Sequence, residues 1–173
     1  MPRFVAFLRG VSPLNASMPA LKRCFERAGF GGVKTLLSSG NVVFDAAAAD
    51  IDTASLERRI EAAMQADLDR GFYTIVRPAA ELQALLATDP FAPFGFPPQA
   101  KRVVSFLREA RPPRVALPLT EGLATVACQH GTHVFTAYLP GDDGPVFMKL
   151  IQQAFGTDVT TRTWDTVRKC AAA

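Results

Sequence analysis

The chain has 173 residues, of which 49% are hydrophobic and 20% charged, an ordinary globular balance that excludes an intrinsically disordered protein. Its formal net charge is +3, and Lys and Arg are scattered along the chain, so the charge pattern does not indicate a nucleic-acid partner. No apolar run approaches the roughly 20 residues that a membrane span needs. We therefore expect one compact domain, or two small ones, with no membrane partner.

The cysteines indicate a reducing compartment. Cys24, Cys128 and Cys170 are odd in number and show no Cys-x-x-Cys spacing. No secretory apolar segment follows Met1-Pro2-Arg3. We expect a cytoplasmic protein, and no motif in the chain indicates a cofactor.

Residues 3–77 follow the order strand, helix, strand, strand, helix, strand. This order is typical of a ferredoxin-like unit, in which the first and third strands are antiparallel central neighbours. Ser17 is expected to cap the first helix, and Gly29 and Gly71 to stop the two helices. The predicted strands are 3–9, 33–37, 41–45 and 72–77, and the predicted helices start at Ser17 and Thr53.

A Pro- and Phe-rich segment over residues 89–99 separates two halves of the chain. Four prolines exclude regular structure there, so we predict a joint between a ferredoxin-like subdomain (1–88) and a smaller αβ subdomain (100–173). The fold class is therefore α+β. In the second half we expect strands at 102–107, 123–129 and 133–139 and helices at 145–155 and 164–170.

The predicted topology brings distant segments to one edge of the first sheet. Arg9 and Gly10 end the first strand, and the turn Ser39-Gly40-Asn41 should meet them there, beside the start of the first helix. Arginine, hydroxyl groups and unpaired backbone N–H groups together suit a small anionic ligand. The alternative is structural: Gly40 supplies positive φ, Ser39 and Asn41 bond their own backbone, and Arg9 pairs with an acid.

At these residues the chain resembles a bacterial family catalogued as domain of unknown function 1697. The resemblance implies an α+β protein with a ferredoxin-like N-terminal part, and it implies no activity. The chain departs from the family pattern at Ser12–Asn15, where a glycine pair is usual, and at Leu36, Ser38 and Thr163. The motifs that carry the resemblance are Arg9-Gly10, Met18 with Leu21, Thr35 ahead of Ser39-Gly40-Asn41, Asp89-Pro90-Phe91 and residues 161–167.

Two further groups are candidates. Thr161, Arg162, Trp164 and Thr166 are expected to open the last helix, with Arg162 as a second anion ligand and Trp164 as a lid, or with Trp164 simply docking the helix. Cys128, His130 and His133 would share one face of a hairpin and could hold zinc, although their spacing matches no established zinc pattern.

The leading interpretation is a protein that binds a small anionic ligand, for example a phosphorylated one, through Arg9, Ser39, Asn41 and Arg162. One alternative is an enzyme of unknown reaction that uses the same cleft. Another is an interaction scaffold that acts through the Phe91–Phe96 segment. The sequence leaves the oligomeric state open.

Overall fold

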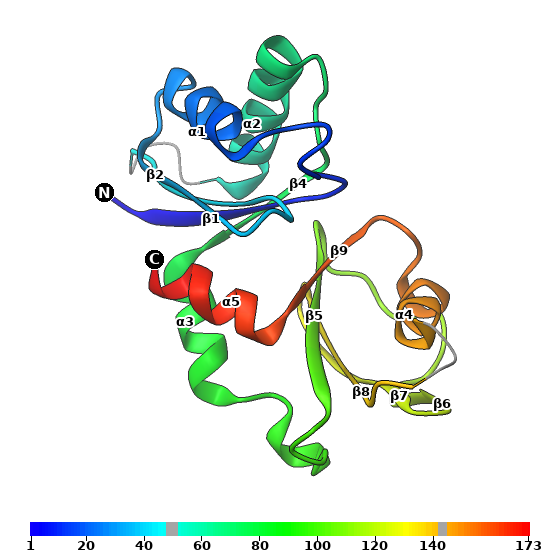
Figure 1. Ribbon diagram of the computed structural model, residues 1–173. Helices are drawn as coiled ribbons and strands as arrows, with labels where there is room; N and C mark the ends of the chain where they lie inside the picture. Colours follow the sequence, from blue (N-terminus) through cyan, green and yellow to red (C-terminus); the bar gives the residue numbers. More distant parts are fainter. Residues whose placement is uncertain (48–51, 142–144) are drawn as a thin grey trace. The chain divides into compact units, whose positions relative to one another are not determined.

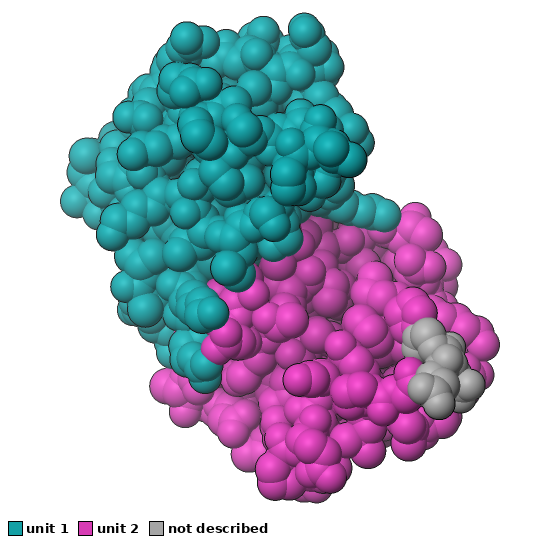
Figure 2. Space-filling view, in the orientation of Figure 1, with its two compact units in different colours: residues 1–84, 168–173 teal, residues 85–167 magenta. Residues whose placement is uncertain are grey.

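The computed structural model describes residues 1–47, 52–141 and 145–173 (Figure 1). The chain divides into two compact units, one of Met1–Ala84 with Arg168–Ala173 and the other of Leu85–Val167 (Figure 2). Both divisions fall inside helices, α3 (Ala79–Thr88) and α5 (Trp164–Ala172). The segment 89–99, expected as a joint, lies within the second unit.

The first unit contains a four-stranded sheet in the order β2-β3-β1-β4, with antiparallel neighbours throughout. The expected antiparallel pairing of the first and third strands is therefore confirmed. β1 lies inside the sheet: it is bonded on both sides, and residues Phe4 to Leu8 are fully buried. The elements are β1 (Arg3–Leu8), α1 (Met18–Arg27), β2 (Gly31–Leu36), β3 (Asn41–Asp45), α2 (Thr53–Leu68) and β4 (Thr74–Pro78).

α1 and α2 pack on one face of the sheet (Figure 1). Ser17 caps α1 as expected, because its hydroxyl accepts from the Ala20 N–H at 3.2 Å. α2 ends at Leu68, three residues before the predicted stop at Gly71, because Asp69 adopts the left-handed conformation with φ of 58°. The apolar faces of the two helices share one core with the sheet, through Leu21, Cys24, Phe25, Leu56, Ile60 and Met64.

The outer edge of β4 is closed by a buried carboxylate. Glu57, on α2, is only 3% exposed, and its Oε2 accepts the Val76 N–H at 2.9 Å. The neighbouring Arg77 is also buried, and burial lowers the pKa of its guanidinium, an effect opposed by the charges of Glu81 and Glu57. Glu57 thus replaces the strand partner that Val76 lacks on this side.

The second unit contains a five-stranded antiparallel sheet in the order β6-β7-β8-β5-β9. Its core forms where α4 packs on one face, chiefly through Leu150, Ile151 and Phe155. The predicted hairpin is confirmed, because His130 faces His133 across the Gly131-Thr132 turn. The elements are the 3₁₀ turn η2 (Ala92–Phe94), β5 (Lys101–Leu107), β6 (Leu119–Glu121), β7 (Ala124–His130), β8 (His133–Tyr138), α4 (Val146–Phe155) and β9 (Val159–Thr163).

One expectation for this unit is wrong. Thr161 and Arg162 belong to β9, which pairs with β5, and do not open the last helix. α5 begins at Trp164, where the Thr163 hydroxyl accepts the Thr166 N–H at 3.1 Å and so caps the helix. None of the helices in the ranges described here is both long and apolar enough to cross a bilayer.

Replacing Glu57 with Ala should lower the free energy of unfolding by about 2 kcal/mol, because a buried N–H loses its acceptor. Urea denaturation measures this change. Glu57→Gln is the matched control, since its amide oxygen still accepts from Val76, and it should cost less than Glu57→Ala. Equal stability of Glu57→Ala and the wild type would contradict the role given to this carboxylate.

Candidate functional site

The end of β1 brings together two of the segments that the topology predicts to meet. The Leu8 N–H donates to the Gly40 carbonyl at 2.8 Å, so the β2–β3 turn is bonded to the last residue of β1. The next N–H, of Arg9, donates to the Tyr73 carbonyl at 2.9 Å, at the approach to β4. We call the surface formed by Arg9, Gly10, Ser39 and Arg70 the Arg9 edge.

Gly40 has a structural reason to be glycine. Its φ is +87°, and a Cβ there would lie 2.9 Å from the Val11 Cβ and 3.1 Å from the Leu8 Cβ. Both the backbone conformation and the close approach therefore exclude a larger residue without a shift. This close approach holds the turn against the segment that follows β1.

Asn41 shapes the same turn. The side chain is fully buried, and its Nδ2 donates to the Leu36 carbonyl at 2.9 Å and to the Ser39 Oγ at 3.0 Å. Its amide nitrogen is thus committed to the turn, as the structural alternative expects. Ser39 itself is exposed, and its hydroxyl accepts the hydrogen bond from the Asn41 amide.

The loop between Gly10 and α1 closes on itself. Asn15 donates from Nδ2 to the Gly10 carbonyl at 2.8 Å and accepts the Ser12 N–H at 2.8 Å. At the start of α1, Pro19 has no N–H, and the Ala20 and Leu21 N–H groups donate to the Ser17 hydroxyl and carbonyl. The helix start therefore has little donor capacity left for a ligand.

Two guanidinium groups remain at this edge. Arg9 is exposed, and its guanidinium group makes no hydrogen bond or ion pair with any residue in the described ranges. Arg70 is exposed too: its Nη2 lies 3.7 Å from the position of a Cβ on Gly10, and its guanidinium carbon lies 4.9 Å from the Phe72 ring centroid. Within the same ranges Arg70 has no carboxylate partner.

Arg70 is a candidate site residue that the sequence pattern does not indicate. The signal was available in the topology, because β4 runs antiparallel to β1 and so starts where β1 ends. A residue just before β4 must then lie near Arg9 and Gly10. From the sequence alone, residues 69–71 indicate only the end of a helix.

Arg162 and Trp164 lie in the second unit and have contacts there. The Arg162 Nη1 donates to the Thr161 carbonyl at 3.0 Å. The Trp164 ring lies against Phe91, at 5.2 Å between centroids, and against Phe135, at 6.2 Å. These contacts are those of a residue that anchors the start of α5, and the roles of lid and anion ligand stay predictions.

Cys128, His130 and His133 point to different surroundings. The Cys128 Sγ lies 3.9 Å from the His130 Nε2, whereas His133 is 4% exposed and packs edge-on against Phe106 at 5.6 Å. The part of the chain that the structure describes contains no group of three or more residues of metal-binding type placed to share an ion.

Burial raises the pKa of the Cys128 thiol, and it raises that of Cys24 to about 11.

The Phe91–Phe96 segment is not a continuous exposed surface. Phe91 is 2% exposed and packs against Phe135. Its ring is therefore not accessible to a partner, as the scaffold alternative would require. Phe94 is 37% exposed and stacks on Phe96, with 5.9 Å between the ring centroids.

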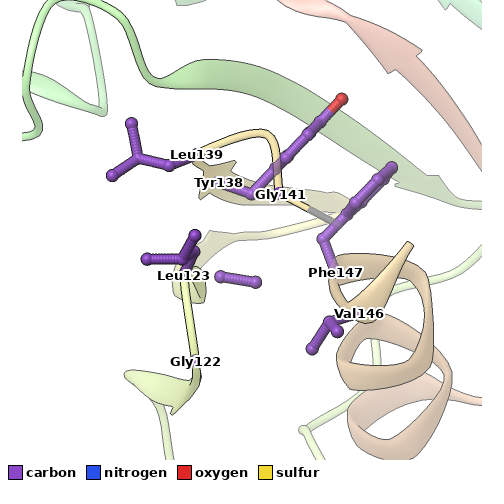
Figure 3. Close-up of a pocket in the computed structure, with 8 residues that line it drawn as sticks. Gly122, Leu123, Tyr138, Leu139, Gly141, Val146 and Phe147 are labelled. Carbon is purple, nitrogen blue, oxygen red and sulfur yellow. The ribbon is translucent and has the colours of Figure 1, made fainter. Parts of the chain in front are cut away.

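Beside Phe96 lies a feature that the sequence did not signal. Two hollows, of about 80 and 200 Å³, share Gly122, Leu123, Tyr138 and Leu139. Figure 3 shows the residues that line the smaller one. The smaller one extends to Phe147 on α4, and the larger one to Phe96. We call the two together the Tyr138 groove.

Comparisons with known proteins give a family and a fold but no activity. The model of a family described as "Protein of unknown function (DUF1697)" matches residues 1–129. A solved structure, that of the conserved bacterial protein SP0830 from Streptococcus pneumoniae, is similar with a TM-score of 0.73 and 17% sequence identity, over 99% of this chain and 97% of that chain. No curated protein matches the chain.

Replacing Gly40 with Ala should lower the free energy of unfolding by about 2 to 4 kcal/mol, because a methyl group meets Val11 in an unfavourable backbone conformation. Denaturant unfolding measures this loss. Gly131→Ala is the control, since its φ is +61° and a Cβ there meets nothing within 4 Å. The control should cost only about 1 kcal/mol, and an equal cost for both variants would refute the close approach.

Alkylation should distinguish the three cysteines. Only the thiolate reacts, and burial raises the pKa of Cys128 above its ordinary 9.0, so its reaction with iodoacetamide should keep accelerating above about pH 9. Cys24 and Cys170 are buried and should react only after unfolding. Mass spectrometry of the labelled peptides reads out each site. A Cys128 rate that levels off near neutral pH would show a lowered pKa and contradict the structure.

Proposed function

The chain belongs to the DUF1697 family of proteins of unknown function, and on that premise we propose that it binds a small anionic ligand, such as a phosphate ester, at the Arg9 edge. The single observation that carries the proposal is that two exposed arginines meet at Gly10 without a carboxylate partner among the described residues: Arg9 directly precedes Gly10, and the Arg70 Nη2 lies 3.7 Å from the position of a Cβ on Gly10. Guanidinium groups bind phosphate and carboxylate oxygens in pairs of strong, charge-assisted hydrogen bonds.

The proposal divides the predicted residues into two roles. Arg9 and Arg70 contact the ligand, and the exposed Ser39 adds a hydroxyl at the same edge. Gly40 and Asn41 hold the turn in shape, as their close approach and hydrogen bonds support. Arg162 and Trp164 are left out, because their contacts in the second unit account for them.

We also propose a fold type for the first unit and a cellular location for the protein. The strand order β2-β3-β1-β4, with two helices on one face, supports a ferredoxin-like assignment for the first unit. Three free cysteines support a cytoplasmic location, where thiols stay reduced. An anionic metabolite of the cytoplasm is the ligand class that fits both the proposed location and the proposed anion site at the Arg9 edge.

Inorganic phosphate, phenyl phosphate and AMP should raise the melting temperature if the Arg9 edge binds phosphate. Each of Arg9→Ala and Arg70→Ala should weaken binding by about tenfold or more, because each removes charged hydrogen bonds to the ligand. Isothermal titration calorimetry gives the affinities. The effect should also fall in 1 M salt, where the Debye length is about 3 Å.

The control is Arg23→Ala, which removes an exposed charge from α1 in the same unit. It should bind phenyl phosphate as the wild type does. If none of the three probes stabilises the protein, or if Arg9→Ala and Arg23→Ala behave alike, the proposal is wrong.

A further inference from the structure

The loop that follows β1 uses most of its own backbone donors. From Ser12 to Ala16, each N–H has an acceptor inside the loop, on Ser12 or on the Asn15 side chain, except at Pro13, which has no N–H. A ligand therefore finds no free backbone donor in this stretch of the loop.

The two N–H groups before this stretch are free. Those of Gly10 and Val11 donate to no residue in the parts of the chain that the structure describes. They follow Arg9 directly, and Gly10 has a φ of +83°. A turn with positive φ can bring successive N–H groups to one side of the chain, where they form a concavity that binds anions. Gly10 and Val11 therefore offer two adjacent backbone donors next to Arg9.

Asn15 fixes the direction of one of these donors. Its Nδ2 donates to the Gly10 carbonyl at 2.8 Å, so the carbonyl of the Gly10–Val11 peptide points toward Asn15. This peptide bond is trans, and in a trans peptide the carbonyl and the N–H point in opposite directions. The Val11 N–H consequently points away from the Asn15 side chain and from the bonds that close the loop.

The space beside Gly10 is open except for a cation. A Cβ on Gly10 would have the Arg70 Nη2 at 3.7 Å, and outside the two neighbouring residues no other described atom would lie within 4 Å. The chain enters residues 48–51 from the opposite end of the sheet, since the Ala46 N–H donates to the Pro2 carbonyl at 3.1 Å, ahead of β1. An anion at Gly10 would therefore have backbone and guanidinium donors close together.

We propose that the Gly10 and Val11 N–H groups bind the anionic group of the ligand together with Arg9 and Arg70, and that this group is a phosphate monoester in preference to a carboxylate. The inference rests on the anion binding proposed for the Arg9 edge and adds to it the backbone donors and the class of anion. Two guanidinium groups match a phosphate monoester, with its charge of about −1.5 to −2 at pH 7, better than the single charge of a carboxylate. A phosphate also presents three acceptor oxygens to the backbone and to two side chains, whereas a carboxylate presents two.

Amide NMR tests the backbone contact in the wild-type protein. In ¹⁵N-labelled protein, phenyl phosphate should move the Gly10 and Val11 amide proton signals downfield, because these protons gain a charged acceptor. The Ser12 and Asn15 amide protons, which already have acceptors, should move much less. Unmoved Gly10 and Val11 signals, under binding that Arg9→Ala weakens, would overturn the backbone contact and leave anion binding at the Arg9 edge intact. Failure of phenyl phosphate to bind at all would overturn the anion site and this inference with it.

Benzoate tests the class of anion, because it carries a carboxylate on the same ring. Calorimetry should give benzoate an affinity about tenfold or more below that of phenyl phosphate. Equal affinities would overturn the preference for phosphate.

Asn15→Ala tests the positioning of the Val11 N–H. The variant keeps both arginines but no longer holds the Gly10–Val11 peptide, so the affinity for phenyl phosphate should fall about three- to tenfold. The Val11 amide shift at saturating phenyl phosphate should also shrink, which a general loss of stability would not cause. A wild-type affinity with an undiminished Val11 shift would overturn the positioning role of Asn15.

Gly10→Ala places a methyl group in the open space beside Arg70 and should weaken phenyl phosphate binding about tenfold or more. Gly131→Ala is the matched control, since Gly131 is also an exposed loop glycine, has a φ of +61° and has nothing within 4 Å of a Cβ. Both variants strain the backbone, but Gly131→Ala should keep the wild-type affinity. Equal affinities of the two variants would show that the anion does not bind at Gly10.

Discussion

The structure of the first unit depends on the two-sided hydrogen bonding of β1. This strand pairs with β3 on one side and β4 on the other, and its residues Phe4 to Leu8 are fully buried. Phe4, Ala6 and Leu8 face the core that the sheet shares with α1 and α2, and a slip by one residue would place Val5 and Phe7 on that face instead. Because β1 is held in register, its end is held too. The bonds from Leu8 to Gly40 and from Arg9 to Tyr73 then determine which loops meet at Arg9.

Much of this arrangement could be predicted from the sequence. Residues 3–9 and 41–45 are apolar on both faces, which favours central strands, and Ser17 stands where a helix cap is needed. β9 could not be recognised in the same way, because Val159–Thr163 carries a single apolar residue and derives its place from pairing with β5. In such short polar strands, pairing with a neighbouring strand determines the structure more than the β propensity of the residues does.

The candidate site was predictable in its location but not in its roles. Topology placed Ser39-Gly40-Asn41 at the end of β1, yet it could not show that the Asn41 amide would be bonded within the turn. Whether this hydrogen bond forms depends on differences of a few tenths of an ångström in the distance between donor and acceptor. The sequence does not indicate Arg70, because this residue belongs to no motif and its position near Gly10 depends on the fold. The Tyr138 groove likewise arises from residues that no pattern links.

The six residues 168–173 have a consequence for how the protein is made. They belong to the first unit, where the Arg3 Nε donates to the Ala173 carbonyl at 2.8 Å and the Gln83 Nε2 to the Ala171 carbonyl at 2.9 Å. During synthesis, residues 1–84 leave the ribosome long before these partners exist. The unit that begins first must therefore be completed last, after the whole of residues 85–167 has been translated.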